Sequence, residues 1–228
     1  MQFYESAQEA LEKVKTGDTI MVGGFGLVGS PLTLIQGLVE KEVRDLTIVS
    51  NNLGEQGKGL GILLQQKKLK KAIGSYFTSN RDVGDALQRG EIEVELLPQG
   101  TLSESIRAGG AGIGGYYTKT AVGTELAKGK EIKEIDGEQY IFEKALVADV
   151  SIIRAQTADK LGNLVYYKTA QNINPLMATA AKYVIAEVDE IVEVGQLQPN
   201  EIQTPHLFVD AVILAKQVLT KDGVVNFG

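Results

Sequence analysis

Short runs of apolar residues alternate along the chain with longer stretches in which apolar residues recur at helical spacing. Ala7, Ala10, Leu11 and Val14 follow Ser6, a good N-cap residue, and predict a short amphipathic helix. The apolar runs predict buried strands at 19–22, 46–49, 72–77, 92–97, 147–154 and 183–188, and further helices are expected at 32–39, 61–70, 82–89 and 175–182. Strands that alternate with helices predict an α/β protein with an open, mostly parallel sheet covered by helices on both faces.

Two segments depart from this alternation. The Asp-Gly pair at 136–137 lies between 131–135 and 138–142, which both show some alternation, and it predicts a small β-hairpin that decorates the sheet. The glycine-rich interval 98–124 is the most loop-like part of the chain. Neither an internal repeat nor an interdomain linker is visible, and 228 residues suffice for one sizeable core. We therefore expect residues 1–228 to form a single domain.

The first cluster of glycines lies between a predicted strand and a predicted helix. Residues 23–29 read Gly-Gly-Phe-Gly-Leu-Val-Gly, and Ser30 and Pro31 are suited to the N-cap and the first residue of the helix that follows. Glycines leave backbone N–H groups uncovered, and a helix N-terminus carries a partial positive charge, so an anionic ligand is expected here. A glycine turn that only permits tight packing of the strand against the helix would explain the same residues.

The same loop also matches a dinucleotide-binding pattern. Gly24, Gly26 and Gly29 form a GxGxxG sequence after a strand and before a helix. A dinucleotide site needs an acidic residue at the end of the second strand to hold the ribose, but the strand at 46–49 is followed by a serine and two asparagines. Asp45 lies at the other end of that strand. An NAD-binding oxidoreductase is thus an alternative that the sequence weakens.

Composition narrows the possible functions. A net charge of -6 argues against a nucleic-acid surface, which needs clustered Lys and Arg. The chain has no cysteine and one histidine, which excludes thiolate catalysis, disulfides and thiolate or multi-histidine metal sites. The first residues lack the pattern of a secretory signal, and no apolar run approaches the ~20 residues needed to cross a bilayer. We therefore expect a cytoplasmic protein without a bound metal.

A longer string around the first glycine loop carries a family resemblance. Residues 17–31, in which Gly-Gly-Phe is followed after three positions by Gly and then by Pro, resemble the signature of the family I CoA-transferases. The resemblance continues through 46–52, 59–61, 94–102, 107–112 and 172–175. In particular, the chain is similar to the alpha subunit of the 3-oxoacid and acetate-type enzymes. This resemblance implies the CoA-transferase fold, an obligate second chain (the beta subunit) in an A2B2 heterotetramer, and coenzyme A or acyl-CoA as a substrate without a permanently bound cofactor.

The resemblance also implies how the chemistry is divided. In this family a glutamate of the beta chain, in a Ser-Glu-Asn-Gly string, attacks the acyl-CoA and carries CoA to a second acid, such as a short-chain carboxylate or a 3-oxoacid. Asn51 stands in the similar place here, so the chain should lack the nucleophile. Gln99, in the family's Pro-Gln-Gly motif, would place its amide at the thioester oxyanion. The residues expected at CoA or substrate are Gly23, Gly24, Phe25, Gly26, Leu27, Val28, Gly29, Asn51 and Asn52.

Other conspicuous residues are expected to be structural. Glu55 fits a solvated loop charge, and His206 receives no catalytic role. The remaining candidates are lysines that fit a solvated helix face, although they could meet CoA phosphates, and tyrosines that fit the core or an interface. They are Lys67, Lys68, Lys70 and Lys71, and Tyr116, Tyr117, Tyr166 and Tyr167. A non-catalytic CoA-binding protein is the third hypothesis beside the transferase and the oxidoreductase.

Overall fold

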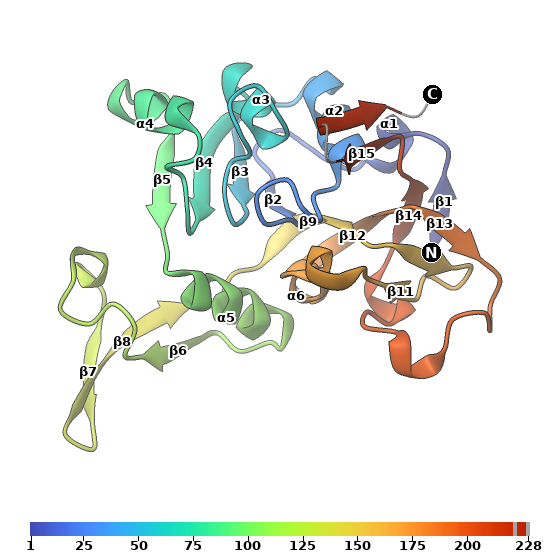
Figure 1. The fold of residues 1–228 in the computed structure, drawn as a ribbon. Coiled ribbons are helices and arrows are strands. Elements are labelled where there is room, and N and C mark those ends of the chain that lie inside the picture. The colour runs from blue at the N-terminus through green and yellow to red at the C-terminus, as the bar shows by residue number, and fades with distance from the viewer. Residues whose placement is uncertain (221–222, 227–228) are drawn as a thin grey trace.

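The computed structural model of the chain, which describes residues 1–220 and 223–226, is built around an eight-stranded sheet in the order β1-β14-β12-β9-β2-β3-β4-β5 (Figure 1). Every neighbouring pair in this sheet is parallel. Its strands are β1 (Gln2–Tyr4), β2 (Thr19–Val22), β3 (Leu46–Val49), β4 (Leu69–Gly74), β5 (Glu93–Leu96), β9 (Ala148–Arg154), β12 (Ala181–Val188) and β14 (Ala211–Leu214). The predicted parallel sheet is confirmed, and β1 at one edge and its neighbour β14 were not predicted.

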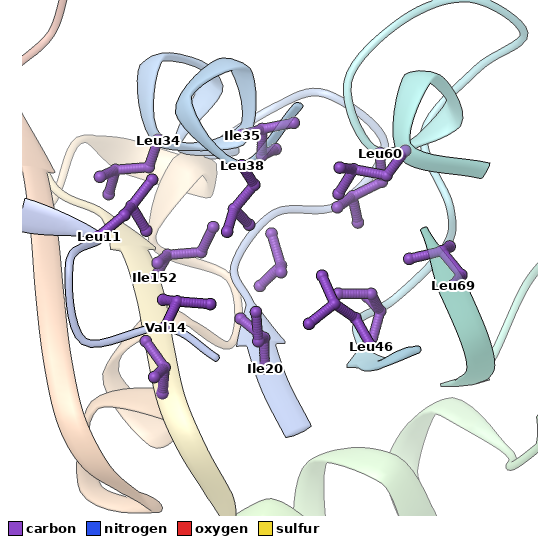
Figure 2. Close-up of a cluster of buried hydrophobic side chains, with 14 of the residues drawn as sticks. Leu11, Val14, Ile20, Leu34, Ile35, Leu38, Leu46, Leu60, Leu69 and Ile152 are labelled. Carbon is purple, nitrogen blue, oxygen red and sulfur yellow. The ribbon is translucent and has the colours of Figure 1, made fainter. Parts of the chain in front are cut away.

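Helices cover both faces of this sheet. They are α1 (Ala7–Ala10), α2 (Leu32–Glu40), α3 (Leu60–Gln65) and α4 (Arg81–Gln88) on one face, and α5 (Gln99–Gly110) and α6 (Asn174–Thr179) on the other. Figure 2 shows the first of the two cores, in which Leu34 and Leu38 of α2 lie above Ile20 of β2. The next residue of that strand, Met21, packs in the second core with Leu102 of α5. Successive strand residues point to opposite faces, so one strand serves both layers.

Smaller elements surround the main sheet. β6 (Gly115–Thr118), β7 (Ile132–Ile135) and β8 (Glu138–Lys144) form an antiparallel sheet that extends away from the body of the molecule (Figure 1). The predicted hairpin is its β7-β8 pair. The other strands are β10 (Thr157–Asp159), β11 (Leu164–Val165), β13 (Glu190–Val192), β15 (Gln217–Thr220) and β16 (Gly223–Asn226), and the single-turn helices are η1 (Glu125–Ala127), η2 (Lys168–Gln171), η3 (Pro199–Glu201) and η4 (His206–Phe208). No helix in the described residues is both long and apolar enough to cross a membrane.

Several predicted boundaries were wrong. The helix expected at 61–70 ends at Gln65, because the chain turns through Lys67 at a φ of 55° and enters β4 at Leu69. The helix expected at 175–182 likewise ends early, because β12 already begins at Ala181. The first helix, α1, is a single turn that Ser6 caps by accepting a hydrogen bond from the backbone N–H of Glu9.

The interval 98–124 contains a helix where a loop was expected. α5 has 12 residues and buries Leu102 and Ile106, which are four positions apart. Its glycines weaken the helical signal, but they permit close packing. A Cβ at Gly109 would lie 2.0 Å from the backbone oxygen of Leu146, and one at Gly110 would lie 2.0 Å from Oγ1 of Thr179. Tertiary packing therefore stabilises a helix that propensity alone does not favour.

The order of the strands reverses direction next to β2. From β2 the chain moves through α2 to β3 on one side, whereas β9 leads to β12 on the other side. Ligands of open α/β sheets bind at the carboxyl ends of the strands where the order reverses in this way. Residues 23–29 follow β2 at that point, and Arg154 ends the neighbouring strand β9. The topology therefore indicates a ligand site beside the first glycine loop.

Candidate functional site

The glycine loop, residues 23–29, contains a tight turn at the carboxyl end of β2. The backbone N–H of Phe25 donates to the oxygen of Val28 at 2.9 Å, and the N–H of Val28 donates back at 3.2 Å. Gly26 and Gly29 adopt φ values of 62° and 70°, which residues with a Cβ seldom adopt. The side chain of Leu27 is buried, whereas Phe25 at the tip is 57% exposed. The glycines therefore shape the loop and leave one of its faces open.

Two asparagines at the start of α6 hold this loop: Asn172 lies two residues before the helix, and Asn174 is its first residue. The N–H of Gly24 donates to Oδ1 of Asn172 at 3.3 Å, and Nδ2 of Asn174 donates to the oxygen of Gly29 at 3.0 Å. Asn174 is completely buried, and a Cβ at Gly23 would lie only 1.7 Å from its Oδ1. Sequence reasoning missed both residues as part of the site. The available signal was the Asn-Ile-Asn-Pro string at 172–175, which was noted only for its resemblance.

The amino end of α2 differs from the prediction. The helix begins at Leu32, and Ser30 is not its N-cap, because its hydroxyl donates to the backbone oxygen of Gly23 at 3.2 Å. Instead, the carboxylate of Glu187 accepts a hydrogen bond from the N–H of Leu34 at 3.0 Å and one from the hydroxyl of Thr33 at 3.2 Å. A carboxylate of the chain itself therefore occupies the helix end that was expected to attract an anionic ligand.

The electrostatics of Glu187 follow from its burial. Loss of solvation raises the pKa of this fully buried carboxyl to about 7, although the nearby guanidinium of Arg154 acts to lower it. Nε of Arg154 lies 3.8 Å from the carboxylate, and its terminal nitrogen pairs with Asp189. Arg154 and Glu187 lie opposite each other near the carboxyl ends of the paired strands β9 and β12.

The glycine loop itself offers free backbone donors. Among residues 1–220 and 223–226, no hydrogen-bond partner is found for the N–H groups of Gly26, Leu27 and Gly29. A Cβ built on Gly26 would meet nothing within 4 Å. Uncovered N–H groups on an open loop can bind an anionic or carbonyl oxygen. The loop, and not the end of α2, is therefore the better candidate for binding an oxygen of a ligand.

A second group of polar side chains follows the next three strands. This amide cluster consists of Asn51 and Asn52 after β3, Ser75 after β4, and Gln99 after β5. Nδ2 of Asn51 donates to Oε1 of Gln99 at 2.7 Å and to Oγ of Ser75 at 2.9 Å, and the hydroxyl of Ser75 also donates to Oε1 of Gln99. Asn51 is 2% exposed and Asn52 is 8% exposed. The predicted location of Gln99 at the carboxyl edge is confirmed, and it is the first residue of α5.

The free space on the two sides of the glycine loop differs greatly in volume. Between the loop and the amide cluster the free volume is about 10 Å³, enough for roughly one water molecule. On the β9 side of the loop, a crevice of about 420 Å³ is lined by Leu27, Val28, Arg154, Gln156 and Tyr167 together with neighbouring residues. The loop therefore packs tightly against the amide cluster on one side and borders an open crevice on the other.

The structure separates the other candidates from this site. Glu55 is exposed and forms an ion pair with Lys58 at 3.4 Å, as expected of a loop charge. The lysine group lies at the amino end of β4, away from the carboxyl edge. Its members do not share a helix face as expected, and Lys67 and Lys71 pair with Glu91 and Glu95 at 2.8 Å and 2.6 Å.

The tyrosines and the histidine have partners of their own. Tyr166 is buried and its hydroxyl lies 2.7 Å from Oγ1 of Thr204, and burial raises the pKa of Tyr166. Tyr116 donates to the backbone oxygen of Thr101 at 2.9 Å. Tyr167 is the exception among these candidates, because it is exposed and lines the crevice beside the glycine loop. His206 is exposed at the start of η4, far along the chain from the glycine loop.

Comparison with known proteins agrees with this geometry. The family model described as Coenzyme A transferase matches residues 4–215. One chain of the succinyl-CoA:3-ketoacid coenzyme A transferase of Helicobacter pylori is 52% identical over 204 residues, which cover 90% of this chain and 88% of that protein. The alpha chain of the acetate CoA-transferase of Escherichia coli is 43% identical over 210 residues, 92% of this chain and 96% of that protein.

A solved structure shows the same fold. An acyl-CoA transferase of Escherichia coli, crystallised as a thioester complex with CoA, superposes with a TM-score of 0.83 at 24% identity. The match covers 94% of this chain and 47% of that one, so the chain spans about half the length of the solved protein. The fold and the loops at its carboxyl edge define an open α/β protein with a candidate ligand site beside β2. The chain belongs to the Coenzyme A transferase family, and the dinucleotide-binding alternative is set aside.

Proposed function

We propose that this chain is the alpha subunit of an enzyme that moves coenzyme A between an acyl-CoA and a short-chain carboxylate or 3-oxoacid. The observation that carries the proposal is the orientation of Gln99. Its Oε1 accepts hydrogen bonds from Asn51 and Ser75, so its Nε2 faces away from both donors. The nearest partner of Nε2 is Oγ of Ser103 at 3.5 Å, a distance too long to engage it fully. Gln99 can therefore present an N–H group to an oxyanion.

The proposed reaction begins on the partner chain. A glutamate carboxylate of the beta chain attacks the thioester carbonyl, and the C–S bond breaks to release the CoA thiolate and leave an acyl-glutamyl anhydride. The thiolate then attacks the glutamyl carbonyl, which forms a glutamyl thioester and frees the first acid. A second acid reverses these steps. Each attack places negative charge on a carbonyl oxygen, which the amide of Gln99 would stabilise.

The glycine loop would receive the acyl-CoA. Its free N–H groups at Gly26, Leu27 and Gly29 can donate to a carbonyl or carboxylate oxygen, and its exposed face permits close approach. Phe25 and Val28, both exposed at the tip, would contact the substrate or the partner chain. Gly23 and Gly24 would act mainly by holding the shape of the loop against Asn172 and Asn174.

The assembly that we propose is an A2B2 heterotetramer in the cytoplasm, with residues 1–228 acting as one domain. Two observations support a partner. Asn51 stands in the similar place to the family's nucleophilic glutamate, and the curated relatives carry the names of single subunits. No resident cofactor is needed, because carboxylates and amides carry the chemistry and coenzyme A arrives as a substrate.

The experiment is reconstitution with the product of the adjacent gene. CoA exchange is then measured across acetoacetate, acetate, butyrate and succinate with the matching acyl-CoA donors. We expect turnover by the complex and none by either chain alone. A complex that assembles and binds acyl-CoA without exchanging it would favour the non-catalytic CoA-binding protein instead.

A further inference from the structure

Asn52 and Asn51 form a directional chain of hydrogen bonds that ends on Gln99. The backbone N–H of Gly54 donates to Oδ1 of Asn52 at 2.9 Å. Nδ2 of Asn52 then donates to Oδ1 of Asn51 at 3.2 Å, and Nδ2 of Asn51 donates to Oε1 of Gln99 at 2.7 Å. Each of the three side-chain amides accepts a hydrogen bond on its oxygen, and the two asparagines also donate one from their nitrogen.

A backbone group fixes the direction of this chain. An N–H group can only donate, so the side of Asn52 that faces Gly54 must be its oxygen. That choice turns the nitrogen of Asn52 toward Asn51, and the same reasoning then turns the nitrogen of Asn51 toward Gln99. If the amide of Gln99 were reversed, two nitrogen donors would face each other across 2.7 Å. The orientation of the Gln99 amide is therefore determined by the backbone N–H of Gly54, three hydrogen bonds away.

The backbone conformation at Gly54 places its N–H where the chain of hydrogen bonds begins. Its φ is 60°, and a Cβ there would lie 2.5 Å from the backbone oxygen of Lys58 and 3.0 Å from the backbone nitrogen of Leu60. Only glycine fits this turn, which aims its N–H at Asn52. The near-complete burial of both asparagines leaves the amide oxygens and nitrogens little access to water as an alternative partner.

We infer that Asn51 and Asn52 are positioning residues that act through Gln99: they set its amide so that Nε2, and not Oε1, faces the reacting carbonyl. The inference rests on the proposed function, in which Gln99 stabilises the oxyanion. An inverted amide would present oxygen lone pairs to a developing negative charge, so the rate should respond to amide orientation even when every side chain stays in place.

The experiment is a double-mutant cycle on kcat in the complex with the beta chain. Asn52→Asp keeps the shape and the acceptor for Gly54 but removes the donor to Asn51. We expect N52D to lower kcat by about tenfold or more, approaching the roughly 10²- to 10³-fold loss typical of removing an oxyanion donor. In the Gln99→Ala background, where no amide remains to be oriented, the same change should alter kcat by less than twofold.

Two further variants keep the test decisive. Asn163→Asp is the matched control, since Asn163, like Asn52, accepts a hydrogen bond from a backbone N–H, that of His206 at 2.9 Å, and donates one from its nitrogen, to Oδ2 of Asp159 at 2.8 Å, without touching the chain of amides. It should change kcat by less than twofold. If N52D does not assemble, Ser75→Ala removes the other donor to Gln99 and should lower kcat several-fold only when Gln99 is present.

The outcomes separate the two claims. Losses that multiply independently, with N52D or S75A costing the same factor with and without Gln99, would overturn the positioning role alone. A Gln99→Ala enzyme within twofold of the wild type would overturn both the oxyanion role and the inference that depends on it. Equal losses in N163D and N52D would also overturn the positioning role, because they would reduce the effect to a general cost of replacing an asparagine by an aspartate.

Discussion

The carboxylate of Glu187 accepts a hydrogen bond from the backbone N–H of Leu34, 153 positions earlier in the chain, at 3.0 Å. This contact joins the end of β12 to the amino end of α2 across the base of the glycine loop. Because burial raises the pKa of Glu187 to about 7, this contact puts a carboxyl that titrates near neutral pH at the amino end of the helix that follows the glycine loop.

The first prediction concerns the pH dependence of stability. Burial raises the pKa of Glu187 from 4.5 to about 7, so between these values the folded chain binds a proton that the unfolded chain releases. The stability that this group contributes is therefore fully present below pH 4.5 and is lost as pH rises through 7. One pKa unit corresponds to about 1.4 kcal/mol, so the loss should be on the order of 3 kcal/mol.

Glu187→Gln should remove this dependence. Thermal melting of variant and wild type between pH 5 and 8 should show the stability difference shifting in favour of the variant as pH rises. Asp149→Asn is the control, because Lys182 and the N–H of Thr19 lower the pKa of Asp149 below its usual value of 3.8, so Asp149 stays ionised throughout this range and the stability difference between D149N and the wild type should not change with pH. Parallel melting curves for wild type and E187Q across this range would contradict the prediction.

The second prediction concerns the open face of the glycine loop. Gly26→Val should raise KM for acyl-CoA several-fold to about tenfold, because a branched side chain would enter the open space beside the free N–H groups. Gly57→Val is the control: Gly57 lies in the turn after β3 with a φ of 70°, also with nothing within 4 Å of its Cβ position. Both variants should lose similar stability. An equal rise in KM for G57V would remove the specific role of the loop.

The third prediction concerns the clasp behind the loop, formed by Asn172 and Asn174. Asn174→Ala should destabilise the chain by about 2 to 4 kcal/mol, since the backbone oxygen of Gly29 and the N–H of Arg154 lose a partner that is itself completely buried. The loosened loop should also raise KM. Asn163→Ala, which removes a contact with His206 far from the loop, should leave KM unchanged. A stable N174A protein with normal KM would show that the loop holds its shape without the clasp.

The sequence predicted the central sheet better than the contacts that build the site. Strands such as β2 and β3 are buried on both faces, so they appear as continuous apolar runs. α5 remained hidden because its glycines suit a loop equally well, and only packing against Leu146 and Thr179 explains them. The clasp on the glycine loop joins residues 145 and 148 positions apart, and no local pattern marks such pairs.

The amide cluster lies between these extremes. Gln99 could be predicted at the carboxyl edge because it follows a strand and a proline, and the structure confirms that location. The direction of its amide could not be predicted, since it depends on a backbone N–H of Gly54 that reaches it through two asparagines. Residue identity indicates the chemistry that is available, whereas the hydrogen-bond pattern decides which atom is presented.

The last prediction concerns which chain becomes covalently modified. Incubating the assembled enzyme with acyl-CoA, reducing with borohydride and locating the product by mass spectrometry should identify a glutamate of the beta chain, and every glutamate of this chain should remain unmodified. Only a carboxylate can form the anhydride and the thioester, and the position that corresponds to the nucleophile here is the buried amide Asn51.

Two glutamates of this chain that could be considered as nucleophiles are unsuited to the reaction. Glu55 is exposed and pairs with Lys58, whereas Glu187 is fully buried and is held by Thr33 and Leu34 at the amino end of α2. Neither carboxylate belongs to the amide cluster, where an oxyanion could be stabilised as the thioester is attacked. A reduced adduct on Glu55, or exchange activity from this chain without its partner, would overturn the proposed division of the chemistry between the two chains.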